Sequence, residues 1–284
     1  MPIEIKAVTR RFGDTVALDS VSTVFEEGKI YGLLGNNGAG KTTLLSIVTD
    51  RLMPNGGQVL MDGESVHNND RALGRMFLMG EQNLFPDDMR VRQALKAAES
   101  YYPRFDRAYA DGLAQRFGLN TKKKIKALST GYASIFRLIL GLSCGADYVF
   151  YDEPVLGLDA QHRDLFYRLL IERYAQFGRT AVISTHLIAE VADIVSHTVI
   201  IRDGHILKDA PTEELVADAY TVSGPASLVD AYIADKRLLS ANTLGGLKSA
   251  SVHGAPESLP EGLELSKLDL QDYFIALMDE EDRK

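Results

Sequence analysis

The sequence predicts an α/β protein whose core is a mainly parallel β-sheet flanked by helices, with a small α+β domain appended to it. Apolar, strand-like segments alternate with helical patterns from Ile30 to Val199, which is typical of βαβ units and a parallel sheet. Two short apolar segments precede this stretch, Ile3 to Val8 and Val21 to Phe25, and we expect them to form antiparallel strands. The alternation stops after Pro211, so a different fold is expected beyond that residue.

Two domains follow from this pattern, a core domain over residues 1–218 and a small accessory domain over residues 219–284. Within the core domain, residues 92–143 have helical patterns and no strand signal, which predicts a helical subdomain. In the accessory domain, glycines and prolines separate short strand and helix candidates, and no site motif is present. We therefore interpret this domain as a packing appendage, with a regulatory or dimer-contacting role as the alternative.

Composition limits the classes to which the chain can belong. Hydrophobic residues make up 45% and charged residues 25% of the 284 residues, which predicts a folded globular protein. The longest apolar runs are far shorter than the roughly 20 residues that cross a bilayer, and the amino-terminal segment lacks the pattern of a secretory signal. With Cys144 as the single cysteine, a cytoplasmic location is expected. The net charge of −8 argues against nucleic acid as a partner.

A glycine-rich loop lies between a short apolar strand, Ile30 to Leu34, and the apolar side of a helix, Leu44 to Val48. It matches the phosphate-loop pattern G-x-x-x-x-G-K-[ST] in the required strand, loop, helix context. Its glycines let the backbone approach phosphates closely, and the N–H groups at the helix start point toward the anion. Lys41 is expected to reach the β- and γ-phosphates of ATP, and the Thr42 hydroxyl to hold Mg²⁺. The residues predicted to bind the nucleotide here are Gly35, Asn36, Asn37, Gly38, Ala39, Gly40, Lys41, Thr42 and Thr43.

Two carboxylates follow a second apolar strand. The segment Asp147 to Tyr151 leads directly into Asp152 and Glu153, and nucleotides bind at the carboxyl ends of the strands in open α/β sheets. Asp152 is predicted to bind Mg²⁺, and Glu153 is predicted to accept a proton from the attacking water. Another strand, Thr180 to Thr185, is rich in β-branched residues and ends at His186. That imidazole is therefore expected at the same edge of the sheet.

These motifs follow one another along the chain in the order found in the ATP-binding cassette family, the nucleotide-binding subunits of ABC transporters. The chain resembles this family over about residues 3–218. The family's signature segment, usually Leu-Ser-Gly-Gly-Gln, begins a helix ahead of the Asp-Glu strand. Residues 128–132, Leu-Ser-Thr-Gly-Tyr, resemble it and keep Ser129 and Gly131. The resemblance implies that these two residues hold the γ-phosphate of ATP bound to a second subunit, as a helix N-terminus meeting an anion. A plain helix cap is the alternative role of Ser129.

Three more residues take roles from the resemblance. Asp159 matches the D-loop of the family, which contacts the partner's site across a dimer. His186 matches the switch histidine, which is implied to contact the γ-phosphate. Phe12 resembles the aromatic residue that stacks on adenine, although a ring between two short strands can equally belong to the core.

The Q-loop segment, residues 76–86, can be aligned with the family in more than one register. Gln82 is the residue predicted to bind Mg²⁺ or to orient water, and Glu81 is the alternative. A glutamate would add negative charge beside the metal and the triphosphate.

The signature and the D-loop also depart from the family pattern. Thr130 and Tyr132 replace a glycine and a glutamine, and Leu156 stands where a serine is common. Nucleotide binding is expected to survive these changes. A bulky Tyr132 can alter how two subunits close, so the rate of hydrolysis is the property they put in question.

The resemblance implies an ATPase that drives transport, with export favoured, through a membrane subunit that is a separate chain. The expected partners are a transmembrane permease and a second ATP-binding subunit, which is another copy or a related chain, and the permease would hold the protein at the inner face of the cell membrane. One alternative is an ABC ATPase outside transport, although such relatives usually carry two cassettes or a long coiled-coil insertion. Another is a regulatory module with slow turnover, against which the retention of Glu153 and His186 argues.

Overall fold

The chain divides into two compact units. The computed structural model describes residues 2–217, 219–256 and 258–282. The first unit comprises Met1–His186 and Thr198–Asp209, and the second comprises Leu187–His197 and Ala210–Lys284. Asp218, at the predicted boundary between the two domains, lies outside the described residues, and that boundary remains a prediction.

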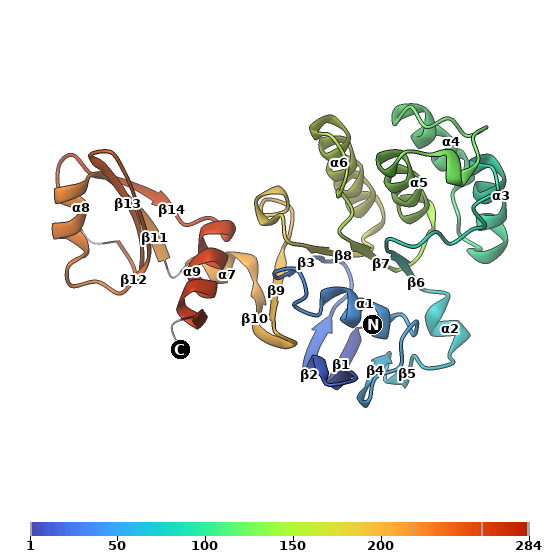
Figure 1. Ribbon diagram of the computed structural model, residues 1–284, viewed down its shortest axis with the longest axis horizontal. Coiled ribbons are helices and arrows are strands. Elements are labelled where there is room, and N and C mark those ends of the chain that lie inside the picture. The colour runs from blue at the N-terminus through green and yellow to red at the C-terminus, as the bar shows by residue number, and fades with distance from the viewer. Residues whose placement is uncertain (1, 218, 257, 283–284) are drawn as a thin grey trace. The chain divides into compact units, whose positions relative to one another are not determined.

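A six-stranded sheet lies at the centre of the first unit (Figure 1). In spatial order its strands are β10 (His205–Pro211), β9 (His197–Arg202), β3 (Ile30–Leu34), β8 (Thr180–Thr185), β7 (Tyr148–Asp152) and β6 (Met76–Met79). The four strands from β3 to β6 pair in parallel. Every residue of these four strands is buried, as expected for a parallel sheet covered on both faces. The predicted α/β class with a mainly parallel sheet is confirmed.

Helices cover both faces of this sheet. Helix α1 (Lys41–Val48) lies on one side, and α5 (Thr130–Ser143) and α6 (Ala160–Phe177) lie on the other (Figure 1). The first unit also contains the helices α2 (Asp70–Leu73), α3 (Val91–Tyr101) and α4 (Arg107–Arg116) and the 3₁₀ turn η1 (Ile125–Ala127). A further 3₁₀ turn, η2 (Ile188–Glu190), belongs to the second unit. Among the described residues, no helix combines the length and the apolar composition needed to cross a membrane.

An antiparallel sheet packs on the other side of α1. It consists of β2 (Thr15–Phe25), β1 (Ile3–Phe12), β4 (Gly56–Met61) and β5 (Glu64–Ser65), in that spatial order. The pairing of β1 with β2 confirms the antiparallel strands predicted from the sequence. Leu44, Leu45 and Val48 of α1 are buried in one cluster with apolar residues of both sheets. Burial of this kind contributes about 25 cal/mol per Å² of apolar surface, so α1 is held from both sides.

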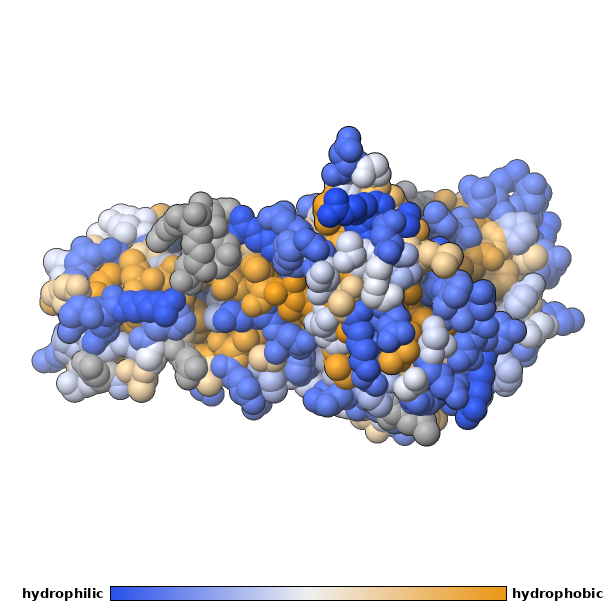
Figure 2. Space-filling model, turned by 90° about the horizontal axis from the view of Figure 1, so that it is seen from below, coloured by the Kyte–Doolittle hydropathy of each residue, from blue (hydrophilic) through white to orange (hydrophobic). Residues whose placement is uncertain are grey.

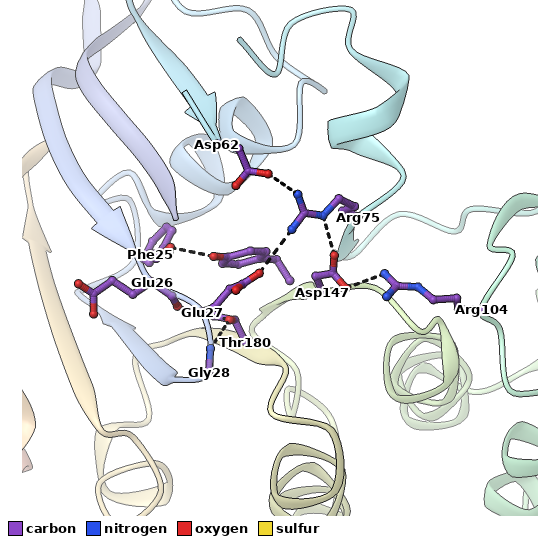
Figure 3. Close-up of polar contacts among 10 residues, drawn as sticks. Phe25, Glu26, Glu27, Gly28, Asp62, Arg75, Arg104, Asp147 and Thr180 are labelled. Atoms are coloured by element: carbon purple, nitrogen blue, oxygen red, sulfur yellow. Dashed lines mark hydrogen bonds and ion pairs between the residues drawn. The ribbon is translucent and has the colours of Figure 1, made fainter. Parts of the chain in front are cut away.

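A network of charged side chains joins the parts of the first unit near the amino end of β7, opposite the strand ends that carry the glycine-rich loop. Figure 3 shows the Arg75 guanidinium between Asp62 and Asp147, with Arg104 on the far side of Asp147. The distance from Asp147 Oδ2 to Arg75 Nε is 2.6 Å, and that from Asp147 Oδ1 to Arg104 Nη2 is also 2.6 Å. Asp62 follows β4 and Arg104 follows α3. Asp147 therefore connects the antiparallel sheet and the helical segment to the central sheet.

The Asp147→Asn substitution is expected to lower the free energy of unfolding by about 1–3 kcal/mol at pH 7, because two charge-assisted hydrogen bonds weaken. Burial acts to raise the pKa of Asp147, but hydrogen bonds from Arg75 and Arg104 outweigh it and hold the pKa below its ordinary value of 3.8. A depressed pKa in the folded state means that this contribution is present above pH 3.8 and is lost as the pH falls through the folded pKa. Urea unfolding measured from pH 7 downward tests this.

The matched control is Asp164→Asn, which removes a carboxylate from an exposed ion pair with Arg168. Exposed pairs of this kind contribute about 0–1 kcal/mol. A loss at Asp147 that equals the loss at Asp164, or that persists unchanged into acid, would show that the network does not stabilise the unit.

The second unit contains a four-stranded antiparallel sheet. In spatial order its strands are β12 (Leu238–Leu244), β13 (Leu247–His253), β11 (Ala219–Pro225) and β14 (Glu264–Lys267), and its helices are α7 (Thr212–Ala217), α8 (Ala226–Ile233) and α9 (Leu270–Asp282). Both β11 and β12 pair antiparallel with β13, so β11, α8 and β12 form a split βαβ unit. Val222, Val229 and Ala250 form its core. The predicted α+β class of the appended part is confirmed.

Apolar side chains also reach the surface, as the orange patches of Figure 2 show for the face it presents. In the second unit, Leu244 is 84% exposed and Leu247 is 62% exposed, and both lie at the turn between β12 and β13. Whether this unit is a packing appendage or a regulatory element remains a prediction.

Candidate active site

The loop between β3 and α1 is a tight cradle of backbone. A Cβ atom added to Gly35 would lie 2.3 Å from the carbonyl oxygen of Ile201, and one added to Gly40 would lie 2.6 Å from that of Ala17. Gly40 also has a φ of 110°, which residues other than glycine rarely adopt. Only glycine fits these two positions, so the loop can bring its N–H groups toward a bound anion.

Lys41 extends inward from the first residue of α1 and is 5% exposed. Its Nζ donates hydrogen bonds to the carbonyl oxygens of Gly35, at 2.6 Å, and Asn36, at 3.1 Å. The same Nζ lies 3.5 Å from Glu153 Oε1. The ammonium therefore sits inside the loop, beside the end of β7.

A cavity of about 470 Å³ opens over this loop. It brings together the helix start, the residue after β7 and the residue after β8, as the sequence predicts. The residues lining it are Ala17, Asn37, Gly38, Ala39, Gly40, Lys41, Thr42, Thr43, Glu81, Glu153, Leu156 and His186.

Asp152 ends β7 and is 7% exposed. In the parallel pairing it lies opposite Ser184 of β8, whose hydroxyl donates to Asp152 Oδ1 at 2.8 Å. Burial raises the pKa of the Asp152 carboxyl above its ordinary value of 3.8, and hydrogen bonds from Thr42 and Ser184 oppose that rise. A cation beside these oxygens would stabilise the buried charge in the same way.

Glu153 is held in one orientation by its neighbours. Its φ is 46°, in the left-handed region that residues other than glycine seldom adopt. Its backbone N–H donates to the Ser184 carbonyl at 2.8 Å. The Thr185 hydroxyl donates to Oε2 at 3.3 Å, and His186 Nδ1 lies 2.9 Å from Oε1. The strained backbone is thus fixed by β8, which aims the carboxylate into the cavity.

The polar groups at this site suit a nucleotide bound together with a divalent cation. Thr42 and Asp152 supply a hydroxyl and a carboxylate oxygen, which are the ligands that Mg²⁺ prefers. Lys41 and the N–H groups of the glycine-rich loop supply positive potential for phosphates. The oxygen ligands and the anion cradle adjoin one another, so this site fits Mg²⁺ and a triphosphate together.

The two Q-loop candidates are placed differently. Glu81 lines the cavity, and Gln82 is exposed and is not among the described residues that line it. Arg137 Nη1 donates to the Glu81 carbonyl oxygen. The structure therefore brings the alternative, Glu81, to the site, and the role predicted for Gln82 remains a prediction without support from this arrangement.

The signature segment is not part of the described lining of the cavity in its own chain. Ser129 caps α5, its hydroxyl accepting a hydrogen bond from the Tyr132 N–H at 3.4 Å. Asp159 caps α6, with Oδ1 accepting from the His162 N–H at 2.9 Å. Among the described residues lining the cavity, neither of these residues nor Gly131 is found. The roles predicted for these residues toward ATP therefore stay predictions.

The signature and the D-loop contact each other within the chain. A Cβ on Gly131 would lie 3.0 Å from the Gly157 carbonyl oxygen, so Gly131 permits a close approach of the two backbones. The Tyr132 ring meets the His162 ring edge-on with 6.5 Å between centroids, and His162 Nδ1 lies 2.9 Å from Asp159 Oδ2. Tyr132, which replaces the usual glutamine, therefore packs beside the D-loop.

Phe12 lies at the end of β1 and is 48% exposed. The Arg10 guanidinium lies 4.6 Å from the centroid of its ring. The ring is available at the surface instead of being buried in the core. Stacking on adenine remains a prediction for it.

Sequence reasoning did not identify Ser184 and Thr185 as site residues, although their hydroxyls bond the two acidic side chains at the end of β7, Asp152 and Glu153 respectively. The signal was present, because these residues end a buried strand just before His186. Their roles depend on β8 lying beside β7, and that strand order is not visible from the sequence. Ala17 and Leu156 also line the cavity without having been predicted to do so.

Comparisons with known proteins point to one family. The model of the ABC transporter family matches residues 18–156. The chain is 31% identical over 235 residues to the Nod factor export ATP-binding protein I of Burkholderia lata, a match covering 79% of this chain and 77% of that protein. Identity to the ABC transporter ATP-binding protein YtrB of Bacillus subtilis is 28% over 213 residues, covering 75% and 73%. Identity to the petrobactin import ATP-binding protein YclP of Bacillus subtilis is 25% over 242 residues, covering 80% of this chain and 96% of that protein.

The fold is shared with solved cassettes. A dimeric ATP-binding cassette in a post-hydrolysis state, bound to ADP and Pi, superposes with a TM-score of 0.65 at 20% identity, covering 74% of this chain and 98% of that one. Family match, relatives and fold agree, and the chain belongs to the ATP-binding subunits of the ABC transporter family.

Proposed function

We propose that this protein binds Mg²⁺-ATP in the cavity over α1 and hydrolyses it to drive transport through a separate membrane subunit. The observation that carries the proposal is the convergence of Lys41, Glu153 and His186 around one cavity lined by the glycine-rich loop, with Asp152 directly before Glu153 at the end of β7. These side chains come from the ends of three different elements. Their meeting supplies a cation, a metal-binding acid and a base within a single site.

The side chains divide the chemistry among them. Lys41 and the loop N–H groups bind the phosphates, and Thr42 and Asp152 hold the metal ion, which would neutralise the charge on the leaving phosphates. Glu153 accepts the proton of the attacking water, because its carboxylate is directed into the cavity by Thr185 and His186. His186, which is at the same cavity, contacts the γ-phosphate.

Hydrolysis is proposed to require two ATP-binding subunits, as a homodimer or with a related chain. The N-terminus of α5 offers N–H groups of the kind that bind phosphate. The dimeric cassette bound to ADP and Pi provides a precedent for such a pair in this fold.

The membrane partner is proposed to be a permease that holds the protein at the inner face of the cell membrane. Named relatives serve both directions of transport. Identity is 31% to the Nod factor export subunit, 29% to a ribose import protein and 25% to the petrobactin import subunit. These values do not separate the two directions, and export stays a prediction from the resemblance.

One observation favours a second candidate, an ATP-dependent regulatory module with slow turnover. Glu81 brings a carboxylate to the cavity where the family usually has an amide, and added negative charge opposes the binding of a triphosphate. The rate of hydrolysis by the purified protein distinguishes this candidate from the transport motor.

Affinity capture from native membranes tests the transport role. Tagged protein with Glu153→Gln, incubated with Mg²⁺-ATP and gently solubilised, is expected to retain one multi-span membrane protein in a fixed ratio, because blocked hydrolysis prolongs the closed state. Lys41→Ala protein is the control, and it should retain less. Capture of ribosomes or DNA-repair factors in place of a membrane protein would contradict the proposal.

A further inference from the structure

Two neighbouring side chains on α5 reach the two loops that border the cavity. Ser134 and Arg137 are three positions apart and so lie on the same face of the helix. Both are within the first turns after Ser129, the residue that caps α5. Their hydrogen bonds end at Glu81 and Leu156, and both of those residues line the cavity.

Arg137 forms the centre of this arrangement. Its Nη1 donates to the Glu81 carbonyl oxygen, and its Nη2 donates to the Ser134 hydroxyl at 3.0 Å. The Ser134 hydroxyl in turn donates to the Leu156 carbonyl oxygen at 3.3 Å. One guanidinium therefore connects the helix to the Q-loop directly and to the D-loop through a serine. Guanidinium geometry is planar and fixed, so both connections have a defined direction.

Burial strengthens these contacts. Ser134 is 4% exposed, and Arg137 Nε is buried without a hydrogen-bond partner in the described part of the chain. Burial lowers the pKa of Arg137, and the nearby Glu81 carboxylate opposes that shift. The hydrogen bond from Arg137 thus reaches the backbone of Glu81, the Q-loop residue that lines the cavity.

We propose that Arg137 is a positioning residue for hydrolysis: it ties α5 to Glu81 and, through Ser134, to Leu156. A helix moves as a rigid element, so engagement of the Ser129 end by a nucleotide moves Ser134 and Arg137 with it. Both cavity loops follow. The signature segment and the cavity of the same chain are therefore coupled through α5, and this step rests on the proposed ATPase function.

Hydrogen exchange of the nucleotide-free protein tests the connection without relying on activity. Arg137→Ala is expected to increase exchange of the amides in residues 80–84 and 155–158 about tenfold, since loops released from a fixed partner open locally. Ser134→Ala is expected to increase exchange mainly in residues 155–158, because it removes the hydroxyl that bonds Leu156. Arg168→Ala, in an exposed ion pair on α6, is the matched control and should change neither segment.

Steady-state kinetics tests the effect on hydrolysis. Arg137→Ala is expected to lower kcat about tenfold or more while KM for Mg²⁺-ATP changes less than about threefold, since small misplacements of catalytic groups reduce the rate strongly. Arg137→Lys should recover part of the rate, because it keeps the charge but loses the fixed fork.

The outcomes separate this inference from the proposed function. If exchange in residues 80–84 is the same in Arg137→Ala as in Arg168→Ala, or if it rises equally throughout the unit together with a lower Tm, Arg137 has no specific positioning role. A kcat of Arg137→Ala equal to that of the wild type would show that the connection has no effect on hydrolysis. Wild-type protein that releases no more phosphate than Lys41→Ala protein would overturn the ATPase function, and the exchange measurements would still decide the connection.

Discussion

Substituting glutamine for Glu153 is expected to lower the rate of ATP hydrolysis about 10²- to 10³-fold and to leave ATP binding intact. The amide keeps the shape of the carboxylate and can still accept the Thr185 hydrogen bond, but it cannot accept a proton from water. Removing a negative charge that lies 3.5 Å from Lys41 Nζ should strengthen, if anything, the attraction between that ammonium and a triphosphate. Phosphate release at saturating Mg²⁺-ATP and a separate binding titration measure the two effects.

Glu172→Gln is the matched control, because it neutralises a glutamate whose side chain is 61% exposed on α6. It should hydrolyse ATP at the wild-type rate. If Glu153→Gln does the same, Glu153 is not the base. A loss of binding that parallels the loss of turnover would instead assign Glu153 to ligand binding.

His186 supports the same assignment through its contact with Glu153. The distance between His186 Nδ1 and Glu153 Oε1 is 2.9 Å, so the two side chains are in direct contact. The rate losses caused by removing residues that act together are not additive. The double variant of Glu153→Gln and His186→Ala is therefore expected to be little slower than Glu153→Gln alone.

The parts of the site that depend on local sequence could be predicted. Gly35 to Thr43 indicate a phosphate loop because the strand, the glycines and the helix start are contiguous. Asp152, Glu153 and His186 could be placed because they follow apolar strands, and parallel strands in an α/β fold end at one edge. In these cases the chemistry-bearing residue and the element that positions it are adjacent in the chain.

The parts that depend on packing could not be predicted. Ser184 reaches Asp152 only because β8 pairs with β7 in a particular register. Arg137 meets Glu81 across 56 residues of sequence, and Ser134 meets Leu156 across 22. The Q-loop register was ambiguous for the same reason: whether Glu81 or Gln82 faces the cavity depends on a loop that α5 holds, and nothing in residues 80–83 encodes that contact.

Replacing Lys41 by alanine is expected to weaken ATP binding about 10²-fold or more, because charge-assisted hydrogen bonds to phosphate contribute about 1.5–3 kcal/mol each. Lys41 is 5% exposed, and its ammonium donates hydrogen bonds to carbonyl oxygens of the glycine-rich loop. It can exchange these contacts for phosphate oxygens without moving far. Calorimetric titration with Mg²⁺-ATP measures the change, and Lys126→Ala, at a side chain that is 56% exposed, is the control and should bind as wild type does.

Mixing this variant with a second one tests the arrangement of the dimer. Protein with Lys41→Ala is expected to bind ATP about 10²-fold more weakly, and Ser129→Arg should block the end of α5 that is proposed to face a partner's nucleotide. Each variant alone is therefore expected to hydrolyse little ATP at a concentration that saturates the wild type. A mixed dimer has one site in which intact Lys41 and intact Ser129 come from different chains, and this site should restore part of the turnover. If mixing restores nothing while Glu153→Gln still abolishes wild-type turnover, hydrolysis takes place within one chain and the N-terminus of α5 has no role across the dimer.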